Sequence, residues 1–195
     1  TGYDNRFGHN RAEGFEGYVR YGCEMGMDVV EAEPFDAGSI RVSSSKVRRL
    51  LGEGLVEQAT SCLGRQYALS GRVVRGEHIG TALGFPTANI QLADADKLIP
   101  ASGVYAVKVE IEGQRGQYHG MMNIGSRPTF GVHRQTLEVH IFHFGDDIYG
   151  RQIQVRFVSR LRSEVKFDSR EALAEQLEAD LHQAEAALHK TTEYD

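Results

Sequence analysis

The feature that most restricts the fold is a set of short segments in which every second residue is apolar. In the segment 105–111, the odd-numbered positions are apolar, with Lys108 and Glu110 between them. The segments 137–142 and 153–157 follow a similar pattern. This period of two is typical of strands with one buried face. Segments 67–75 and 117–124 add two further strand candidates. A succession of short strands, punctuated by Gly and Pro, predicts a closed antiparallel barrel, which leaves no exposed sheet edge.

The hydrophobic pattern changes its period after residue 167. Asp168, Ser169 and Glu171 form a helix-capping signature, and apolar residues then recur every three or four positions. These apolar residues are Leu173, Leu177, Leu181, Ala184 and Leu188. The pattern predicts an amphipathic helix that packs on the barrel and completes a mainly β domain over residues 67–195.

Residues 1–66 have a different character. The start is rich in glycine, 27–32 has the pattern of a short strand, and three serines at 43–45 precede a helix that continues to Leu51. Serine before a helix accepts hydrogen bonds from free backbone amides. Mixed elements of this kind predict an α/β segment, so we expect a domain boundary between 66 and 67.

Composition argues against several classes of protein. The 195 residues carry a net charge of -5, whereas nucleic-acid binding requires a clustered excess of Lys and Arg, so no nucleic-acid partner is expected. No apolar run approaches the roughly 20 residues of a membrane span, so no membrane partner is expected either. The two cysteines, Cys23 and Cys62, fit neither a disulfide framework nor a metal motif, which favours a cytoplasmic protein.

The segment 71–89 carries the densest set of candidate binding residues. Gly76, Gly80 and Gly84 permit positive φ and a close approach of backbone amides, which is how loops bind phosphate oxygens. The segment lacks the Lys-Ser/Thr end of a Walker loop and the strand-to-helix context of a dinucleotide fold. A plain turn between strands is the simpler interpretation of the glycines alone.

Thr87 and Asn89 add a second signal to that segment. They stand two residues apart after Pro86, so in an extended chain both side chains leave the same face. A hydroxyl and an amide oxygen on one face suit a hard cation such as Mg²⁺, with a triphosphate supplying the negative charge. The alternative is a Pro-initiated turn in which Asn89 bonds to its own backbone.

Several ordered motifs resemble one family. The run 71–89, with its Pro86-Thr87-Ala88-Asn89 tetrad, resembles the riboflavin kinase module of bacterial riboflavin kinase/FMN adenylyltransferases. The resemblance continues through 103–106, 123–130, 138–142, 149–150 and 161–167, and covers roughly residues 67 to 188. Several motifs in one order are far more specific than any one of them.

The resemblance implies a fold and a reaction. The fold would be a six-stranded antiparallel Greek-key barrel with a C-terminal helix, and the activity would be transfer of the ATP γ-phosphate to riboflavin, giving FMN, with Mg²⁺ as cofactor. Thr87 and Asn89 would hold Mg-ATP, and Glu138 would be the catalytic base that accepts a proton from the attacking hydroxyl. On the residues alone, Glu138 also fits an ordinary exposed strand carboxylate.

The resemblance also implies binding positions around the two substrates. Arg162, Lys166 and Phe167 match positions that border the flavin, and Phe167 fits equally well a residue that anchors the helix. His140 and His143, taken with His133, lack the ligand spacing of a zinc site and by resemblance lie near the nucleotide. The full set of implied ATP-binding positions is Gly71, Arg75, Gly76, Gly80, Thr81, Pro86, Thr87, Asn89, His140 and His143.

Segments 2–8 and 43–48 resemble the later motifs of the FMN adenylyltransferase module in the same bifunctional proteins. The resemblance assigns Ser44 and Arg48 to that module, with Arg48 at the ATP phosphates. The module's opening strand and its histidine-x-glycine-histidine motif are absent from this sequence. We therefore expect an incomplete α/β nucleotidyltransferase segment over 1–66, and FAD synthesis only where the missing half is present.

Two other functions stay open on the sequence alone. A barrel that binds flavin without turnover would serve as a docking or regulatory module, and it would bind flavin without consuming ATP. A barrel that binds polyanions is opposed by the acidic charge balance.

Overall fold

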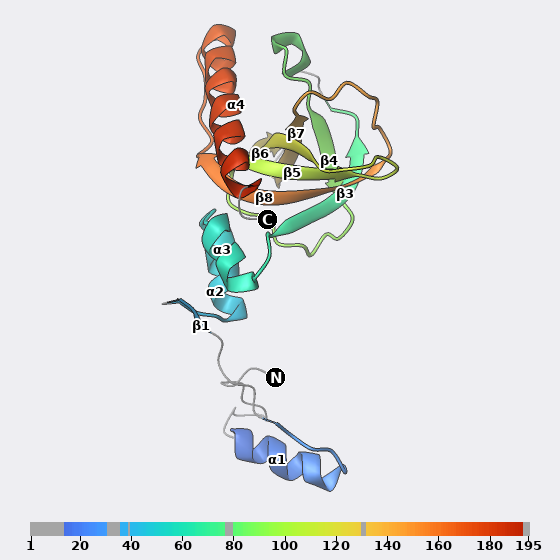
Figure 1. Cartoon of the computed structure of the whole chain (residues 1–195), viewed down its shortest axis with the longest axis vertical. Coiled ribbons are helices and arrows are strands. Elements are labelled where there is room, and N and C mark those ends of the chain that lie inside the picture. Colours follow the sequence, from blue (N-terminus) through green and yellow to red (C-terminus); the bar gives the residue numbers. More distant parts are fainter. Residues whose placement is uncertain (1–13, 31–35, 39, 77–79, 130–131, 193–195) are drawn as a thin grey trace. The chain divides into compact units, whose positions relative to one another are not determined.

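The structure is a computed structural model that describes residues 14–30, 36–38, 40–76, 80–129 and 132–192. The chain divides into two compact units, Thr1–Ser43 and Ser44–Asp195 (Figure 1). Each unit has its own internal contacts, so each is described by itself. Among the described residues no helix is both long enough and apolar enough to cross a membrane.

In the first unit, the described residues form one helix and one pair of short antiparallel strands. Helix α1 spans Phe15–Glu24, and β1 (Asp36–Ala37) pairs antiparallel with β2 (Ile40–Arg41). The strand predicted for 27–32 is wrong over 27–30, where the chain forms no strand, and 31–32 lie outside the described residues. The reason is local packing, because a Cβ on Gly22 would come within 2.3 Å of Val29 Cγ2, so this segment folds back on the helix.

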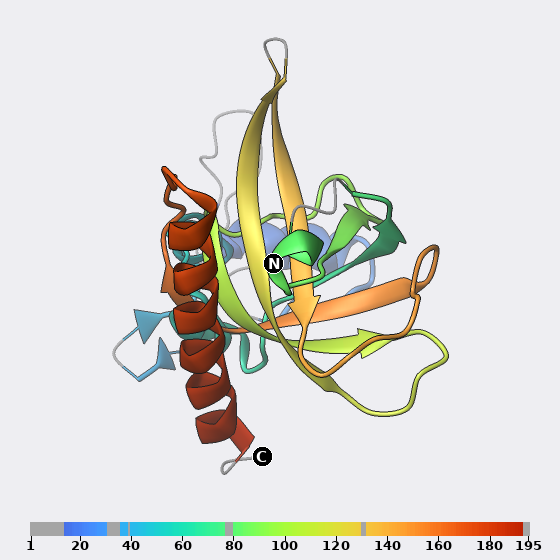
Figure 2. The same ribbon diagram turned by 90° about the horizontal axis from the view of Figure 1, so that it is seen from above.

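The second unit is built on a closed barrel of six antiparallel strands, ordered β3-β4-β7-β6-β5-β8 (Figure 2). Strand β8 lies beside β5 after the β5-β6-β7 meander, which is the Greek-key arrangement. The predicted mainly β fold, with six antiparallel strands and a C-terminal helix, is therefore confirmed. The strands are β3 (Ala68–Val74), β4 (Ala88–Leu92), β5 (Gly103–Ile111), β6 (Tyr118–Thr129), β7 (Val132–Ile141) and β8 (Gln152–Arg162).

The barrel interior is filled by the alternate residues of each strand. Tyr105 and Phe157 are fully buried there, with ring centroids 5.2 Å apart and planes 85° apart. This edge-to-face geometry is favoured by the ring quadrupoles. The other large side chains of the interior include Leu69, Val107, Val109, Met122, Ile124, Val139 and Val155.

Gly71 is required where β3 and β4 approach each other. A Cβ at this position would lie 2.3 Å from the backbone oxygen of Gln91 on β4. Because backbone cannot move aside cheaply, we expect Gly71→Ala to lower the free energy of unfolding by about 3 kcal/mol, at the upper end of overpacking costs. Urea unfolding measures this change, and Ser70→Ala, at an exposed position of the same strand, is the control. An unchanged midpoint for Gly71→Ala would contradict this packing.

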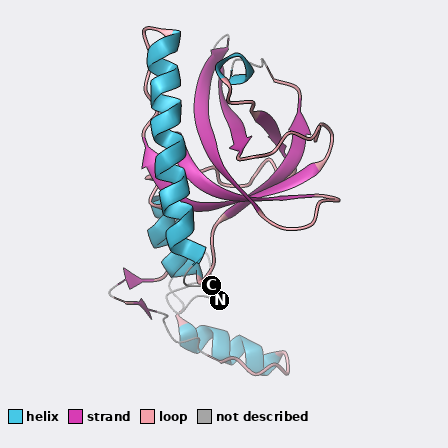
Figure 3. Cartoon of the chain, turned by 45° about the horizontal axis from the view of Figure 1, so that its top comes forward, coloured by secondary structure: helices cyan, strands magenta, loops and turns pink. Residues whose placement is uncertain are grey.

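A long helix covers one outer face of the barrel (Figure 3). Helix α4 spans Arg170–Thr192, and its predicted cap is present, since Ser169 Oγ accepts a hydrogen bond from the amide of Ala172 at 3.1 Å. Ala184 and Leu188 of the helix are fully buried. They form a second core on the outer wall with Val104, Ala106, Met121 and Phe142. The amphipathic pattern therefore predicted both the helix and its packing.

Two short helices belong to the same compact unit as the barrel. They are α2 (Ser44–Gly52), where a helix was expected, and α3 (Val56–Leu63). Arg160 of β8 connects them to the barrel, because its guanidinium donates to the backbone oxygens of Glu53 and Ser102. The predicted boundary between 66 and 67 separates two modules that are defined by resemblance to a family. The division of the structure into compact units does not test that boundary, so it stays a prediction.

Candidate active site

The site begins with a row of residues that runs across the barrel strands. Asn89 of β4 is directly opposite Glu138 of β7, which is opposite Asn123 of β6. The row continues through Val104 of β5 to Arg162 of β8. Directly opposite residues share a face, with Cβ atoms about 5 Å apart. Since the flanking Val139 and Met122 point into the barrel core, this row lies on the outer wall.

Thr87 stands beside the row and contacts its central carboxylate. Thr87 Oγ1 donates a hydrogen bond to Glu138 Oε2 at 3.5 Å. The Asn89 side chain lies against Gly76, where a Cβ would come within 3.2 Å of Asn89 Oδ1 and closer still to its amide nitrogen. A side chain at 76 would therefore displace Asn89. The structure thus brings Thr87, Asn89 and Glu138 together on one face.

A cavity of about 260 Å³ opens between this outer wall, α4 and the 3-10 turn η1 (Gly80–Leu83). Its polar residues include Glu138 with its neighbours Thr87 and Asn123, and its apolar residues come from the barrel wall, η1, the β8–α4 connection and α4. The lining residues are Gly80, Leu83, Phe85, Thr87, Val104, Met121, Asn123, Glu138, His140, Arg162, Glu164, Val165, Phe167, Leu173 and Leu177. Such a cavity, mostly apolar with a few convergent polar groups, suits a small organic ligand.

A second cavity, of about 250 Å³, lies beside the segment that leads into β4. It is lined by the 86–88 segment and by the connection between β7 and β8, including Phe144, Asp146 and Tyr149. Thr87 lines both cavities. A molecule in each would meet at the wall that carries Thr87 and its partner Glu138.

His140 ties the loop before β4 to β7. Its Nδ1 lies 2.8 Å from the backbone oxygen of Pro86, so Nδ1 carries the proton and donates it to that carbonyl. Phe85 and Phe142 pack against the ring, with centroids 5.3 and 5.7 Å away. Burial lowers the pKa of His140, the Pro86 carbonyl opposes that shift, and the nearby His143 adds to it. Through this hydrogen bond and the ring contacts, His140 holds the loop at the cavity.

Two half-buried histidines, His119 and His140, make stability depend on pH. Burial lowers the pKa of His140 and of His119, and the charges of Lys108 and His189 lower the pKa of His119 further. The unfolded chain, with histidine pKa near 6.5, then binds protons in a range where the folded chain does not. We expect the free energy of unfolding to be highest above about pH 6.5. It should fall as the pH drops from there through the lowered pKa values of the folded chain's histidines. Urea unfolding between pH 7.5 and 5 measures this, and His119→Gln should flatten the dependence.

Arg162 holds α4 against the barrel. Its Nε and Nη2 donate to the fully buried carboxylate of Asp180 at 2.7 to 3.0 Å, and Gln176 Nε2 donates to the same carboxylate at 2.9 Å. A third guanidinium nitrogen donates to the backbone oxygen of Ser163. The Phe167 ring lies 5.7 Å from the Arg162 guanidinium carbon. Both residues line the cavity, and Arg162 also has a structural role that its sequence context did not indicate.

The structure places the predicted site residues unevenly. Gly80, Thr87, Glu138, His140, Arg162 and Phe167 line the first cavity, and Pro86 and Thr87 line the second. Asn89 and Gly76 adjoin them. Several other predicted residues line neither cavity. They include Gly71 in the barrel wall, the exposed Arg75 and Lys166, and Ser44 and Arg48 in α2. The Thr81 side chain lies outside the described residues.

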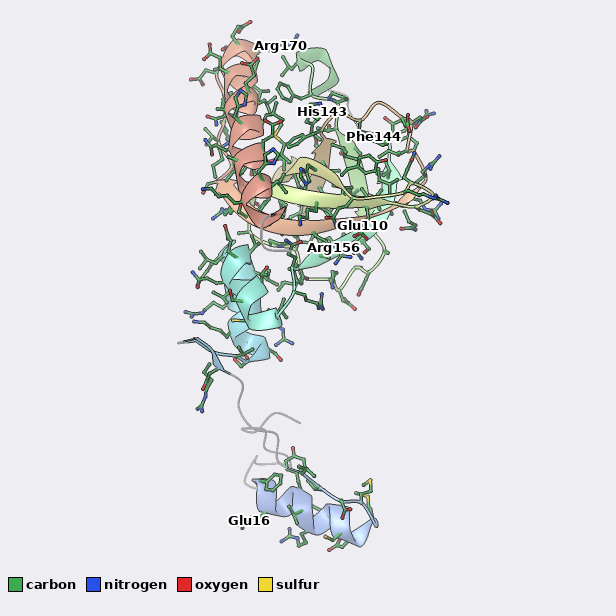
Figure 4. All side chains as sticks on the ribbon, viewed as in Figure 1. Glu16, Glu110, His143, Phe144, Arg156 and Arg170 are labelled. Carbon is green, nitrogen blue, oxygen red and sulfur yellow. The ribbon has the colours of Figure 1, made fainter. Side chains whose placement is uncertain are left out.

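His143 stands apart from the cavity linings as well. It has φ of 53°, its ring is 91% exposed, and its Nε2 lies 4.0 Å from Glu185 Oε1 on α4 (Figure 4). No group of three His, Cys, Asp or Glu residues that could hold a metal is present among the described side chains. Thr87, Asn89 and Glu138 instead offer a hydroxyl, an amide oxygen and a carboxylate. This all-oxygen donor set fits Mg²⁺, which binds few protein ligands and keeps substrate phosphates in its shell.

Several cavity residues were missed as site residues from the sequence. Asn123 and Glu164 lie within the motifs that carry the resemblance, but neither was assigned a role. Asn123 could have been found from strand register, because it is directly opposite Glu138. Val104, Met121, Leu173 and Leu177 carry no chemical signal, since an apolar residue in a strand or helix is read first as core.

The fold and the site together define a class of protein, a six-stranded barrel with a cavity between its outer wall and a C-terminal helix. The family model of riboflavin kinase matches residues 63–188. The chain therefore belongs to the riboflavin kinase family. The alternative of a polyanion-binding barrel is not favoured by this match.

Individual relatives agree with the family. The chain is 41% identical over 180 residues to the bifunctional riboflavin kinase/FMN adenylyltransferase of Escherichia coli (strain K12), covering 92% of this chain and 56% of that protein. It is 39% identical over 166 residues to the protein of the same description from Bacillus subtilis (strain 168), covering 84% and 50%. A crystal structure described as a macrolide-efflux protein from Streptococcus pneumoniae has a TM-score of 0.82 at 35% identity, covering 94% and 58%. The chain spans about half the length of the curated relatives it matches.

Proposed function

We propose that this chain transfers the γ-phosphate of ATP to the terminal ribityl hydroxyl of riboflavin, forming FMN. Membership of the riboflavin kinase family supports the reaction, as do relatives described as riboflavin kinase/FMN adenylyltransferases. The observation that carries the proposal is the contact of Thr87 Oγ1 with Glu138 Oε2, because Thr87 lines both cavities and Glu138 lines the first.

The first cavity suits the flavin. Phe85, Val104 and Leu177 provide apolar surface for a tricyclic ring, whereas the polar residues near Glu138 suit a hydroxylated chain. Phe167, beside Arg162, borders this space and is proposed to cover the ring. Lys166 is exposed and outside the cavity lining, and its proposed place at the polar edge of the flavin comes from the resemblance alone.

The second cavity suits the nucleotide, because it shares Thr87 with the first and has an aromatic residue, Phe144, in its lining. The phosphates would then extend toward Gly76 and Gly80, whose lack of side chains keeps room beside Asn89 and Phe85. Arg75 and Thr81 flank this segment in sequence and are proposed to act on the phosphates. His140 contributes by fixing the Pro86 carbonyl, and His143 is proposed to lie near the nucleotide.

The chemistry follows from these positions. Thr87 Oγ1 and the Asn89 amide oxygen would hold Mg²⁺, which when bound neutralises charge that develops on the transferring phosphate. Glu138 accepts the proton of the ribityl hydroxyl while that oxygen forms its bond to the γ-phosphorus and the bond to the ADP oxygen breaks. The residues act mainly by positioning and by charge, as in other phosphoryl transfers.

The proposal extends to the rest of the protein only in part. Ser44 and Arg48 begin and continue α2, and we propose that residues 1–66 correspond to the end of an FMN adenylyltransferase module. FAD formation would then need the remainder of that module. The two cysteines, Cys23 and Cys62, are free thiols, which suits a reducing compartment, and we propose the cytoplasm as the site of the reaction.

The experiment is incubation of the chain with riboflavin, ATP and Mg²⁺, followed by chromatographic separation of riboflavin, FMN and FAD. We expect FMN in proportion to ADP, and no FAD. Flavin bound with no ATP consumed would instead identify a non-catalytic flavin-binding module. Formation of FAD would contradict the incompleteness of the adenylyltransferase segment.

A further inference from the structure

Three polar side chains gather around a glycine at the rim of the first cavity. A Cβ on Gly125 of β6 would lie 3.0 Å from Glu164 Oε1, 3.0 Å from Thr136 Oγ1 and 3.3 Å from Asn123 Nδ2. Thr136 is directly opposite Gly125 on β7, whereas Glu164 comes from the connection between β8 and α4. A side chain at 125 would therefore push the Glu164 carboxylate away from its present position beside the barrel wall.

The connection that carries Glu164 is fixed at both ends. Arg162 binds Asp180 and the backbone oxygen of Ser163 at its start, and Ser169 caps α4 at its end. Glu164 and Phe167 of this segment both line the cavity. The fixed ends restrict where the exposed Glu164 side chain can lie, and it lines the cavity with its carboxylate beside Gly125.

The position of Asn123 connects this cluster to the reacting group. Asn123 is directly opposite Glu138, so the two side chains start about 5 Å apart on the same face. Glu164 and Asn123 line the same cavity as Glu138. A polyhydroxylated chain whose terminal oxygen sits at Glu138 would place its next hydroxyls beside Asn123 and Glu164.

We propose that Glu164 and Asn123, gathered at Gly125, bind the secondary hydroxyls of the acceptor chain and so determine which hydroxyl reaches Glu138. The inference rests on the proposed function and assigns a specificity role within that site. Glu164 accepts a hydrogen bond from a secondary hydroxyl, and the Asn123 amide donates to or accepts from the same chain. A site built to bond a hydroxyl discriminates strongly against an acceptor that lacks it.

The test compares Glu164→Gln with the parent chain on riboflavin and on its 2′-, 3′- and 4′-deoxy analogues. With riboflavin we expect kcat/KM of Glu164→Gln to fall about tenfold or more, as for loss of a charged hydrogen bond. With the analogue that lacks the bonded hydroxyl, parent and variant should have the same kcat/KM. A purely structural role would lower kcat/KM by the same factor for every acceptor.

Two further variants complete the test. Gly125→Ala should reproduce the acceptor-dependent loss, because its Cβ displaces the Glu164 carboxylate, and Glu171→Gln, at an exposed position of α4, should change nothing. Equal activity of Glu164→Gln and the parent on riboflavin, or a uniform loss on all acceptors, would overturn the inference while leaving riboflavin phosphorylation by the parent intact. Absence of FMN with the parent chain would instead reject the proposed function.

Discussion

Glu138→Gln is expected to lower kcat for FMN formation by about 10²- to 10⁴-fold, the range typical of losing a general base. Glutamine keeps the size of the side chain and can still accept a hydrogen bond from Thr87, whose Oγ1 lies 3.5 Å from Glu138 Oε2. Riboflavin and ATP should therefore still bind. Steady-state kinetics, together with flavin fluorescence titration for binding, measures both quantities.

A matched strand variant controls for general effects of removing a carboxylate. Glu110 of β5 pairs with Arg156, 3.2 Å away, and lies outside both site cavities (Figure 4). Its pKa is lowered mainly by the hydrogen bond from Arg156, so it is ionised like a typical strand carboxylate. Glu110→Gln should leave kcat unchanged. Full activity of Glu138→Gln would remove that residue from the role of base.

Asp180→Ala is expected to lower the free energy of unfolding by about 3 to 5 kcal/mol, because it leaves the largely buried Arg162 guanidinium without its counter-charge. The carboxylate is fully buried and receives bonds from Arg162 and Gln176. Since Arg162 also anchors the start of the 163–169 connection, the variant should weaken flavin binding as well. Urea unfolding and flavin titration measure the two effects.

The double variant Arg162→Met with Asp180→Leu separates charge from packing. Replacing both partners of a buried ion pair by apolar residues of similar size is often close to neutral for stability. We therefore expect the double variant to regain most of the stability lost in Asp180→Ala, but not the flavin affinity. Equal instability of the single and double variants would mean that packing of α4, and not the unpaired charge, dominates.

The repetitive elements could be predicted from the sequence because their patterns are local. The alternation of apolar residues at 137–142 and 153–157 predicted two strands that are present in the barrel. The helical period of apolar residues after 168 predicted α4. The helix α1 and the lack of a strand at 27–30 were not predicted. There the decisive contact is between Gly22 and Val29, and no local periodicity encodes it.

The site could be predicted only where a motif names its residues. Thr87 and Asn89 could be placed on one face from their spacing, and Glu138 and His140 likewise, but the pairing of Asn89 with Glu138 depends on strand register. The partnership of Arg162 with Asp180 joins residues 18 positions apart across the start of a helix. Such contacts arise from tertiary packing, so the sequence did not indicate how α4 is held or where Glu164 would reach.

The most direct test of the account is a crystal structure of the chain with riboflavin, Mg²⁺ and a non-hydrolysable ATP analogue. We expect a cation bound by Thr87 Oγ1 and Asn89 Oδ1, and the terminal ribityl oxygen within hydrogen-bond distance of the Glu138 carboxylate. A flavin bound away from α4, or a cation beyond the reach of Thr87 and Asn89, would contradict it.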